Sequence, residues 1–227
     1  MISSNLVMLS ILGGLLGLDT VSFPQAMLSR PLVAGTLTGA LLGHAAQGLV
    51  LGAVLELFAI DTLPFGASRY PEWGSSSVVG GGLFATMPGT TPGSLTTSVL
   101  AALAVAWVGG WSMVYVRVFN ARLARRRHEA VARGDRNAVV GLQLKSMTAD
   151  LVRGTALTAA GLVAFAPVQR AALGAWGVEA PVSRAVVIAA AAAVSLGATY
   201  KLFHAVPGFL WQFLLGLTTG LAILVLR

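Results

Sequence analysis

Long runs without a charged residue are the feature that most constrains this chain. Residues Ser94 to Val116 contain 23 uncharged residues in succession, and Pro207 to Leu226 contain 20 more. A helix of about 20 apolar residues crosses the hydrocarbon core of a bilayer, which is about 30 Å thick. Only 10% of the 227 residues are charged, whereas soluble domains carry about 25%. The sequence therefore predicts an all-α, multi-pass membrane protein.

Other apolar segments do not fit simple spans. Leu6 to Leu18 is an apolar stretch of thirteen residues, too short to cross a bilayer alone, so it is a half-helix or a helix completed by polar residues that face protein. Pro31 to Leu63 contains 33 residues, which would make one helix of about 50 Å. That segment must break, and the stretch Gly43 to Gly48 is the predicted turn. A helical bundle with broken helices follows.

Glycines recur at four-residue spacing on both sides of this turn. Gly35, Gly39 and Gly43 form one series, and Gly48 and Gly52 form another. Such spacing gives a helix a smooth face that another backbone can approach closely. We expect each piece to pack against a neighbour, either within the chain or in a partner subunit.

The stretch from Pro64 to Gly93 is apolar but interrupted by prolines and glycines. Irregular backbone at membrane depth is tolerated only where it is buried in protein or lines a wet cavity. Val78 to Thr86 is too short to span, so we predict a re-entrant hairpin here, with an extramembrane loop as the alternative. The triplet Gly80 to Gly82 has no neighbouring lysine and indicates a flexible backbone, not a phosphate-binding loop.

We predict a single membrane domain, 1–227, with three parts: a broken-helix half, 1–116, that holds the substrate site; a basic loop, 117–150; and C-terminal helices, 151–227. The net charge is +7, and nine of the fifteen Lys and Arg residues cluster in and beside the loop. They are Arg117, Arg122, Arg125, Arg126, Arg127, Arg133, Arg136, Lys145 and Arg153. Cytoplasmic loops are rich in Lys and Arg, which places this loop in the cytoplasm. Contact with anionic lipid or an acidic soluble partner is the alternative interpretation, and nucleic acid is not expected.

No catalytic machinery, cofactor or metal site is predicted. The chain has no cysteine, its three histidines are not spaced as metal ligands, and no nucleophile or nucleotide motif is present. The first basic residue is Arg30, so no cleavable signal peptide is expected.

Glu56 is the clearest functional candidate, because it lies within an otherwise apolar helix-length run. A charged carboxylate near the centre of a membrane helix costs about 2.5 kcal/mol or more, and such residues usually mark a substrate or ion path. The alternative is a protonated or Arg-paired glutamate that fixes helix packing.

Two further polar groups are candidates for binding a polyhydroxyl ligand. Asp61, Glu72 and Trp73, with the serines 75–77, combine carboxylates, hydroxyls and an aromatic ring. Asp19, Gln25 and Arg30 precede the first long apolar run, where interfacial anchoring is the alternative role.

The stretch Leu15 to Phe58 resembles the C subunit, EIIC, of the mannose/fructose/sorbose family of phosphoenolpyruvate-dependent sugar phosphotransferase systems. The resemblance lies in the order of Asp19, then Ser29-Arg30-Pro31, then Gly35-x3-Gly39, then Leu55-Glu56-Leu57. It implies a permease subunit of the bacterial inner membrane that moves a hexose-type sugar by alternating access. It also implies a membrane D subunit (EIID), soluble A and B subunits that carry the phosphoryl group, and a multimer. The site residues that it implies are Gln25, Glu56, Asp19 and Asp61.

The segment Arg69 to Ser75 departs from the family pattern, in which a Pro-Pro-Asp-like motif is common. Sugar translocation remains the leading hypothesis. A non-transporting sensory or scaffold subunit is the second, and an ion-coupled carrier with Glu56 as its proton site is the third.

Overall fold

The computed structural model describes residues 3–60, 62 and 68–226. Over these residues the chain forms nine helices and no strand, which confirms the predicted all-α membrane fold. The helices are α1 (Ser3–Asp19), α2 (Pro31–Leu41), α3 (Ala45–Phe58), α4 (Trp73–Ala85), α5 (Ser94–Arg126), α6 (His128–Ala132), α7 (Arg136–Gly174), α8 (Ala180–His204) and α9 (Phe209–Val225).

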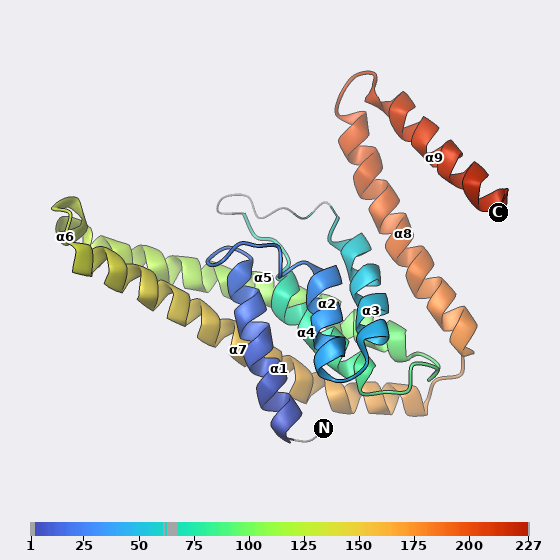
Figure 1. Cartoon of the computed structure of the whole chain (residues 1–227), viewed down its shortest axis with the longest axis horizontal. Helices are drawn as coiled ribbons and strands as arrows, with labels where there is room; N and C mark the ends of the chain where they lie inside the picture. Colours follow the sequence, from blue (N-terminus) through green and yellow to red (C-terminus); the bar gives the residue numbers. More distant parts are fainter. Residues whose placement is uncertain (1–2, 61, 63–67, 227) are drawn as a thin grey trace.

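The short helix α4 lies at the centre of the bundle, and every one of its residues is buried. Helices α1, α2, α3, α5 and α7 surround it (Figure 1). Two apolar clusters fill the spaces between them: Val78 and Val79 of α4 meet Leu9 of α1 and Leu162 of α7, while Leu51 and Leu55 of α3 pack with residues of α5 and α8.

Helices α2 and α3 form a tight hairpin, and the predicted break between them is confirmed. The turn runs through Gly43, whose φ of +78° favours glycine. The four-residue glycine series face each other: a Cβ on Gly48 would lie 2.3 Å from the Gly35 carbonyl oxygen and 2.8 Å from Cα of Gly39. The neighbour that these glycines approach is therefore within the chain itself.

The stretch predicted as a re-entrant hairpin is instead one continuous helix from Trp73 to Ala85. Its glycine triplet is helical and tightly packed, so the interpretation as flexible backbone was wrong. A Cβ on Gly80, Gly81 or Gly82 would lie within about 3.0 Å of a side chain from α5, α2 or α1, respectively. These glycines are present because α4 is surrounded on all sides.

The basic segment 117–150, predicted as a loop, is almost entirely helical. Helix α5 continues to Arg126, and α7 begins at Arg136; α6 and its flanking turns join them. We call the residues 117–150 the arm. Figure 1 shows the arm as an antiparallel helix pair that projects from the body, with α6 at its tip. An irregular loop and a helical arm could have the same amino-acid composition, so the charge pattern alone could not show which of the two this segment forms.

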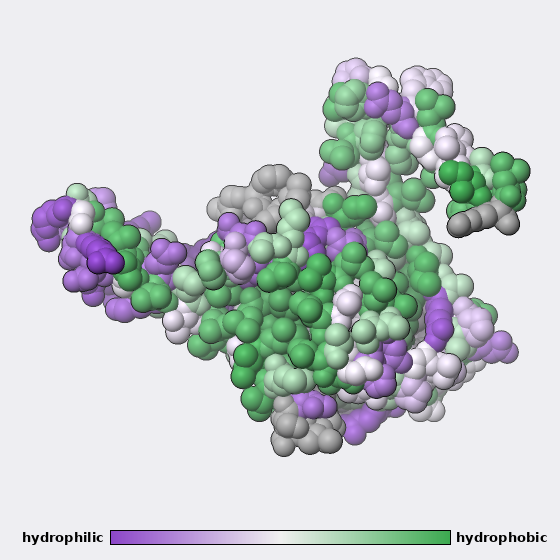
Figure 2. Space-filling model, in the orientation of Figure 1, coloured by the Kyte–Doolittle hydropathy of each residue, from purple (hydrophilic) through white to green (hydrophobic). Residues whose placement is uncertain are grey.

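Helices α5, α7 and α8 are long and apolar enough to cross a membrane, and α1, α2, α3 and α9 are shorter apolar helices. Helix α8 leaves the body along α3, and among the described helices α9 packs only on α8 (Figure 1). No residue of α9 is buried. Figure 2 shows hydrophobic surface over the body and over α9, and hydrophilic surface on the arm.

Candidate functional site

A cavity of about 620 Å³ opens where α1 ends and α4 begins. Its walls come from the segment 19–30, from Ile60 and Thr62 after α3, and from the residues that lead into α4. Among the described residues the lining is Asp19, Thr20, Val21, Gln25, Met27, Ser29, Arg30, Ile60, Thr62, Tyr70, Pro71 and Trp73. A monosaccharide fits within this volume.

Asp19 shapes the first wall. Its carboxylate is buried and accepts hydrogen bonds from the backbone N–H groups of Ala26 at 2.7 Å and Ser29 at 2.8 Å. These bonds fold the segment back over the end of α1. Gln25 and Met27 both have a φ of +60°, a left-handed conformation that is uncommon for residues other than glycine and is often found at functional sites.

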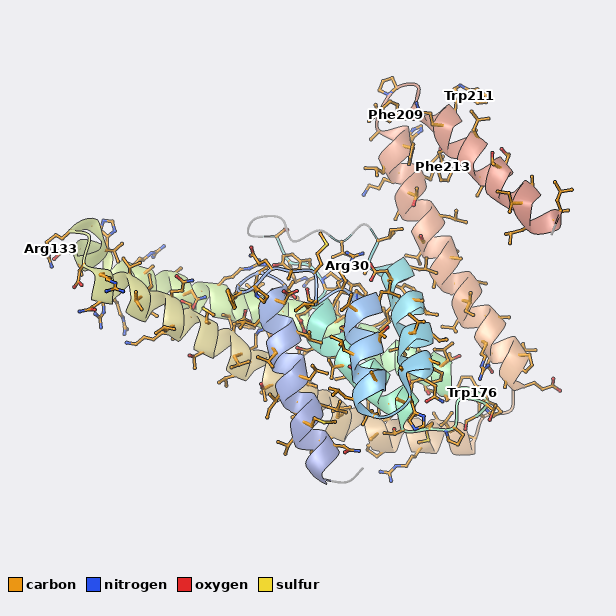
Figure 3. The ribbon with its side chains drawn as sticks, viewed as in Figure 1. Arg30, Arg133, Trp176, Phe209, Trp211 and Phe213 are labelled. Carbon is orange, nitrogen blue, oxygen red and sulfur yellow. The ribbon has the colours of Figure 1, made fainter. Side chains whose placement is uncertain are left out.

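Glu56 lies behind this wall and holds Arg30. The Arg30 Nε donates to Glu56 Oε1 at 2.6 Å, and Nη2 contacts the same oxygen. The other carboxylate oxygen accepts the backbone N–H of Leu32 at 3.1 Å, at the start of α2. Arg30 lines the cavity and precedes α2 as its N-cap residue (Figure 3), whereas Glu56 is not among the described lining residues.

The second wall, Tyr70 to Trp73, is fastened to α5. Arg117 donates from Nη1 to the carbonyl of Ser68 at 2.6 Å, and its guanidinium lies 5.0 Å from the centre of the Tyr70 ring. The guanidinium of Arg69 lies 4.2 Å from the centre of the Trp111 ring. The segment that departs from the family pattern is thus the one anchored by these cation–π contacts.

Three buried hydrogen-bonding atoms of lining residues form no hydrogen bond within the described part of the chain: Thr20 Oγ1, Tyr70 Oη and Trp73 Nε1. Buried polar groups are nearly always hydrogen-bonded, and an indole N–H can act only as a donor. All three atoms are shielded from solvent, so a ligand in the cavity reaches them only when the wall shifts.

A buried ionic network connects the first cavity wall to α5 and α7. Asp150 of α7 accepts Arg153 Nε at 2.8 Å and the hydroxyl of Ser22 at 2.7 Å. Arg153 also donates to Ser112 of α5 at 3.1 Å. Ser22 belongs to the wall segment 19–30, so the network joins α5 and α7 to the cavity. The sequence signal that was missed is the Asp150/Arg153 pair, one helical turn apart.

The structure places the predicted residues in three groups. Asp19, Gln25 and Trp73 line the cavity together with Arg30. Glu56 acts behind it, and Glu72 is fully buried as the N-cap of α4, where its carboxylate accepts the Ser75 N–H at 3.1 Å. Asp61 lies outside the described residues. Thr20 and Tyr70 were missed, because an isolated threonine or tyrosine near an interface carries no distinctive pattern.

In the part of the chain that the structure describes, no three His, Cys, Asp or Glu residues cluster as a metal site. The cavity lining offers hydrogen-bonding groups, the charges of Asp19 and Arg30, and the aromatic faces of Tyr70 and Trp73.

The sequence matches the family model for the sorbose-specific IIC component of the phosphotransferase system over residues 3–173. The chain belongs to this family. It is 27% identical to the fructose permease IIC component of Bacillus subtilis (strain 168) over 149 residues, which cover 66% of this chain and 52% of that protein. It is 28% identical to the mannose-specific EIIC component of Escherichia coli (strain K12) over 90 residues, 34% of each chain.

The match to the fructose permease component spans about half of that protein, and the match to the mannose component spans a third. A solved structure described as that of a membrane protein has the same fold, with a TM-score of 0.76 at 19% identity over 97% of this chain and 87% of the other. That likeness includes α8 and α9, which lie beyond the matched family region.

Proposed function

We propose that this chain is the sugar-translocating membrane subunit of a mannose-family phosphotransferase system and that its cavity binds a hexose-type sugar. The observation that carries the proposal is the cavity itself: it has a volume of about 620 Å³, and its walls hold three buried polar atoms, Thr20 Oγ1, Tyr70 Oη and Trp73 Nε1, that form no hydrogen bond with other described residues. Sugars present hydroxyls around an apolar ring face, and this wall offers both kinds of contact.

Each wall has a distinct part in the proposal. The Trp73 N–H and the Gln25 amide donate to sugar hydroxyls, Asp19 accepts from them, and the ring of Tyr70 or Trp73 covers the apolar sugar face. Asp19 already accepts two backbone N–H groups, but a carboxylate has about four acceptor positions. It therefore retains capacity for a ligand.

Glu56 has a positioning part. Its carboxylate fixes the Arg30 guanidinium and the first turn of α2 at once, so that the basic group faces the cavity in one orientation. This interpretation joins the two sequence hypotheses for Glu56, because an Arg-paired carboxylate here serves the site through its partner.

The proposed partners follow from the family. Soluble A and B subunits supply the phosphoryl group, and a membrane D subunit completes a multimer in a bacterial inner membrane. The apolar faces of α8 and α9 that remain exposed in the single chain support burial against lipid and membrane partners.

Transport in membrane vesicles that contain all partner subunits tests the proposal. Vesicles with the unaltered chain should take up and phosphorylate a hexose. Glu56→Ala should abolish uptake at unchanged protein abundance, because Arg30 loses its partner, whereas Glu179→Ala, at an exposed acid of the α8 start, should leave uptake intact. Normal uptake in Glu56→Ala removes Glu56 from the site. Absence of uptake by the unaltered chain, across a broad sugar panel, contradicts the transport function.

A further inference from the structure

The tip of the arm carries a pocket much smaller than the sugar cavity, of about 70 Å³. It lies between the end of α5 and the start of α7 and is lined by Arg127, Asn137 and Lys145 above an apolar floor of Leu123, Gly141 and Leu142. Gly141 leaves this floor open, because a Cβ there would meet nothing within 4 Å. The volume matches a carboxylate or a similarly small anion, and both cationic side chains border it.

The charges around the pocket have one dominant sign. Seven basic side chains of the arm are exposed, against two exposed acids. The basic ones are Arg122, Arg125, Arg126, Arg127, Arg133, Arg136 and Lys145; the acids are Glu129 and Asp135. Asp135 already accepts the backbone N–H groups of Asn137 and Ala138 as the N-cap of α7. Arg133 stands at the far end of the arm (Figure 3), where Figure 2 shows hydrophilic surface. The tip is thus complementary to an acidic surface.

The position of the tip indicates which acidic surface it meets. Trp107, Trp111 and Tyr115 are exposed at four-residue spacing on α5, and exposed Trp and Tyr residues mark the membrane–water interface. From Tyr115 to Arg126 the helix rises about 16 Å. Even if α5 is tilted by 40° from the membrane normal, the tip stands about 12 Å above the level of Tyr115. The headgroup layer is only about 5–8 Å thick. A protein in the water phase reaches the tip more readily than lipid headgroups do.

The arm and the sugar cavity share one end of the molecule. Arg117, the first arm residue, contacts Ser68 and Tyr70 beside the cavity wall. A protein docked on the arm is therefore held on the same side as the proposed sugar site.

We propose that the arm is the docking surface for a water-soluble protein with an acidic face, and that the tip pocket receives one acidic side chain of that protein between Arg127 and Lys145. The identity of this protein as a phosphoryl-carrying subunit rests on the proposed function; the docking surface rests on the charge, length and pocket of the arm.

Binding of purified A and B subunits to the intact membrane complex, reconstituted in phosphatidylcholine nanodiscs, tests the docking surface. The double variant Arg127→Gln/Lys145→Gln should weaken binding about ten-fold, because two charge contacts at the interface are lost. The control Arg170→Gln/Lys201→Gln removes the same charge from exposed positions outside the arm and should change affinity by less than about two-fold. All four positions are exposed, so neither variant disturbs the fold.

Equal affinities of the two double variants would overturn the proposal. So would a difference that is seen only in nanodiscs containing phosphatidylglycerol, because the two side chains would then serve the lipid surface. Sugar binding to the same nanodiscs separates this proposal from the transport function, because the arm variant should bind sugar normally. If the complex docks its soluble partner but shows no sugar uptake in vesicles, that result contradicts transport and supports the docking surface.

Discussion

At the scale of single residues, the cavity wall contains both unpaired and hydrogen-bonded polar groups. The Trp73 ring is part of the wall, and its indole N–H is buried and has no hydrogen-bond partner among the described residues. Asp19, by contrast, holds its own loop through two backbone hydrogen bonds, so its replacement would change the shape of the wall as well as its chemistry.

Trp73→Phe should weaken sugar binding about five-fold, because the ring is retained while one hydrogen bond of about 1 kcal/mol is lost. Isothermal titration of the purified complex with its transported hexose measures the change. Trp107→Phe, at an exposed position of α5, is the matched control and should bind normally. Unchanged affinity in Trp73→Phe would mean that the indole N–H does not meet the sugar.

Sequence reasoning located part of this site but not its arrangement. Asp19, Gln25 and Trp73 were singled out, and all three line the cavity. Glu56 was singled out as an acid in an apolar run, but the pattern could not show that Arg30, 26 residues earlier, reaches its carboxylate. Arg153 was counted only within the basic cluster and Asp150 was not considered; their one-turn spacing predicts the ion pair, but not its contacts with Ser22 and Ser112 in distant segments.

At the scale of elements, the α2–α3 hairpin is the part most fully specified by local sequence. An apolar run too long for one helix, with glycines on both sides of a predicted turn, favours two helices that pack together as a hairpin. Helix α4 was not predictable in this way. Its glycines and serines pack against five other helices, and these contacts leave no periodic pattern in the local sequence.

Gly48→Ala should destabilise the protein by about 1–3 kcal/mol, because its new Cβ would meet backbone atoms of α2 that cannot move aside. Gly197→Ala in α8, where a Cβ meets nothing within 4 Å, should be neutral or stabilising by up to about 1 kcal/mol. Thermal unfolding in one detergent compares the two. A Gly48→Ala protein as stable as the unaltered one would show that the hairpin is not closely packed.

At the scale of the whole molecule, the network of Ser22, Asp150, Arg153 and Ser112 connects the arm helices to the cavity. Asp150 and Arg153 are almost fully buried, with side-chain exposures of 4% and 7%. Removing one partner of such a pair leaves a charge without compensation.

Asp150→Asn should lower the free energy of unfolding by about 3–5 kcal/mol. Ser22→Ala removes only the hydroxyl that links Asp150 to the cavity wall, so it should cost about 1 kcal/mol and weaken sugar binding by more than its effect on stability suggests. Denaturation curves and sugar titrations of both variants check this order. Equal sugar affinity in Ser22→Ala and the unaltered chain would show that the network supports the fold alone.

The bare helix α9 has a practical consequence for extraction. Helix α9 is attached to the rest through α8 and exposes a second hydrophobic surface away from the main bundle. A micelle that wraps only the bundle leaves this helix uncoated, and extracted particles will then stick together through it. The choice of detergent will consequently decide whether purified material runs as one species or as several.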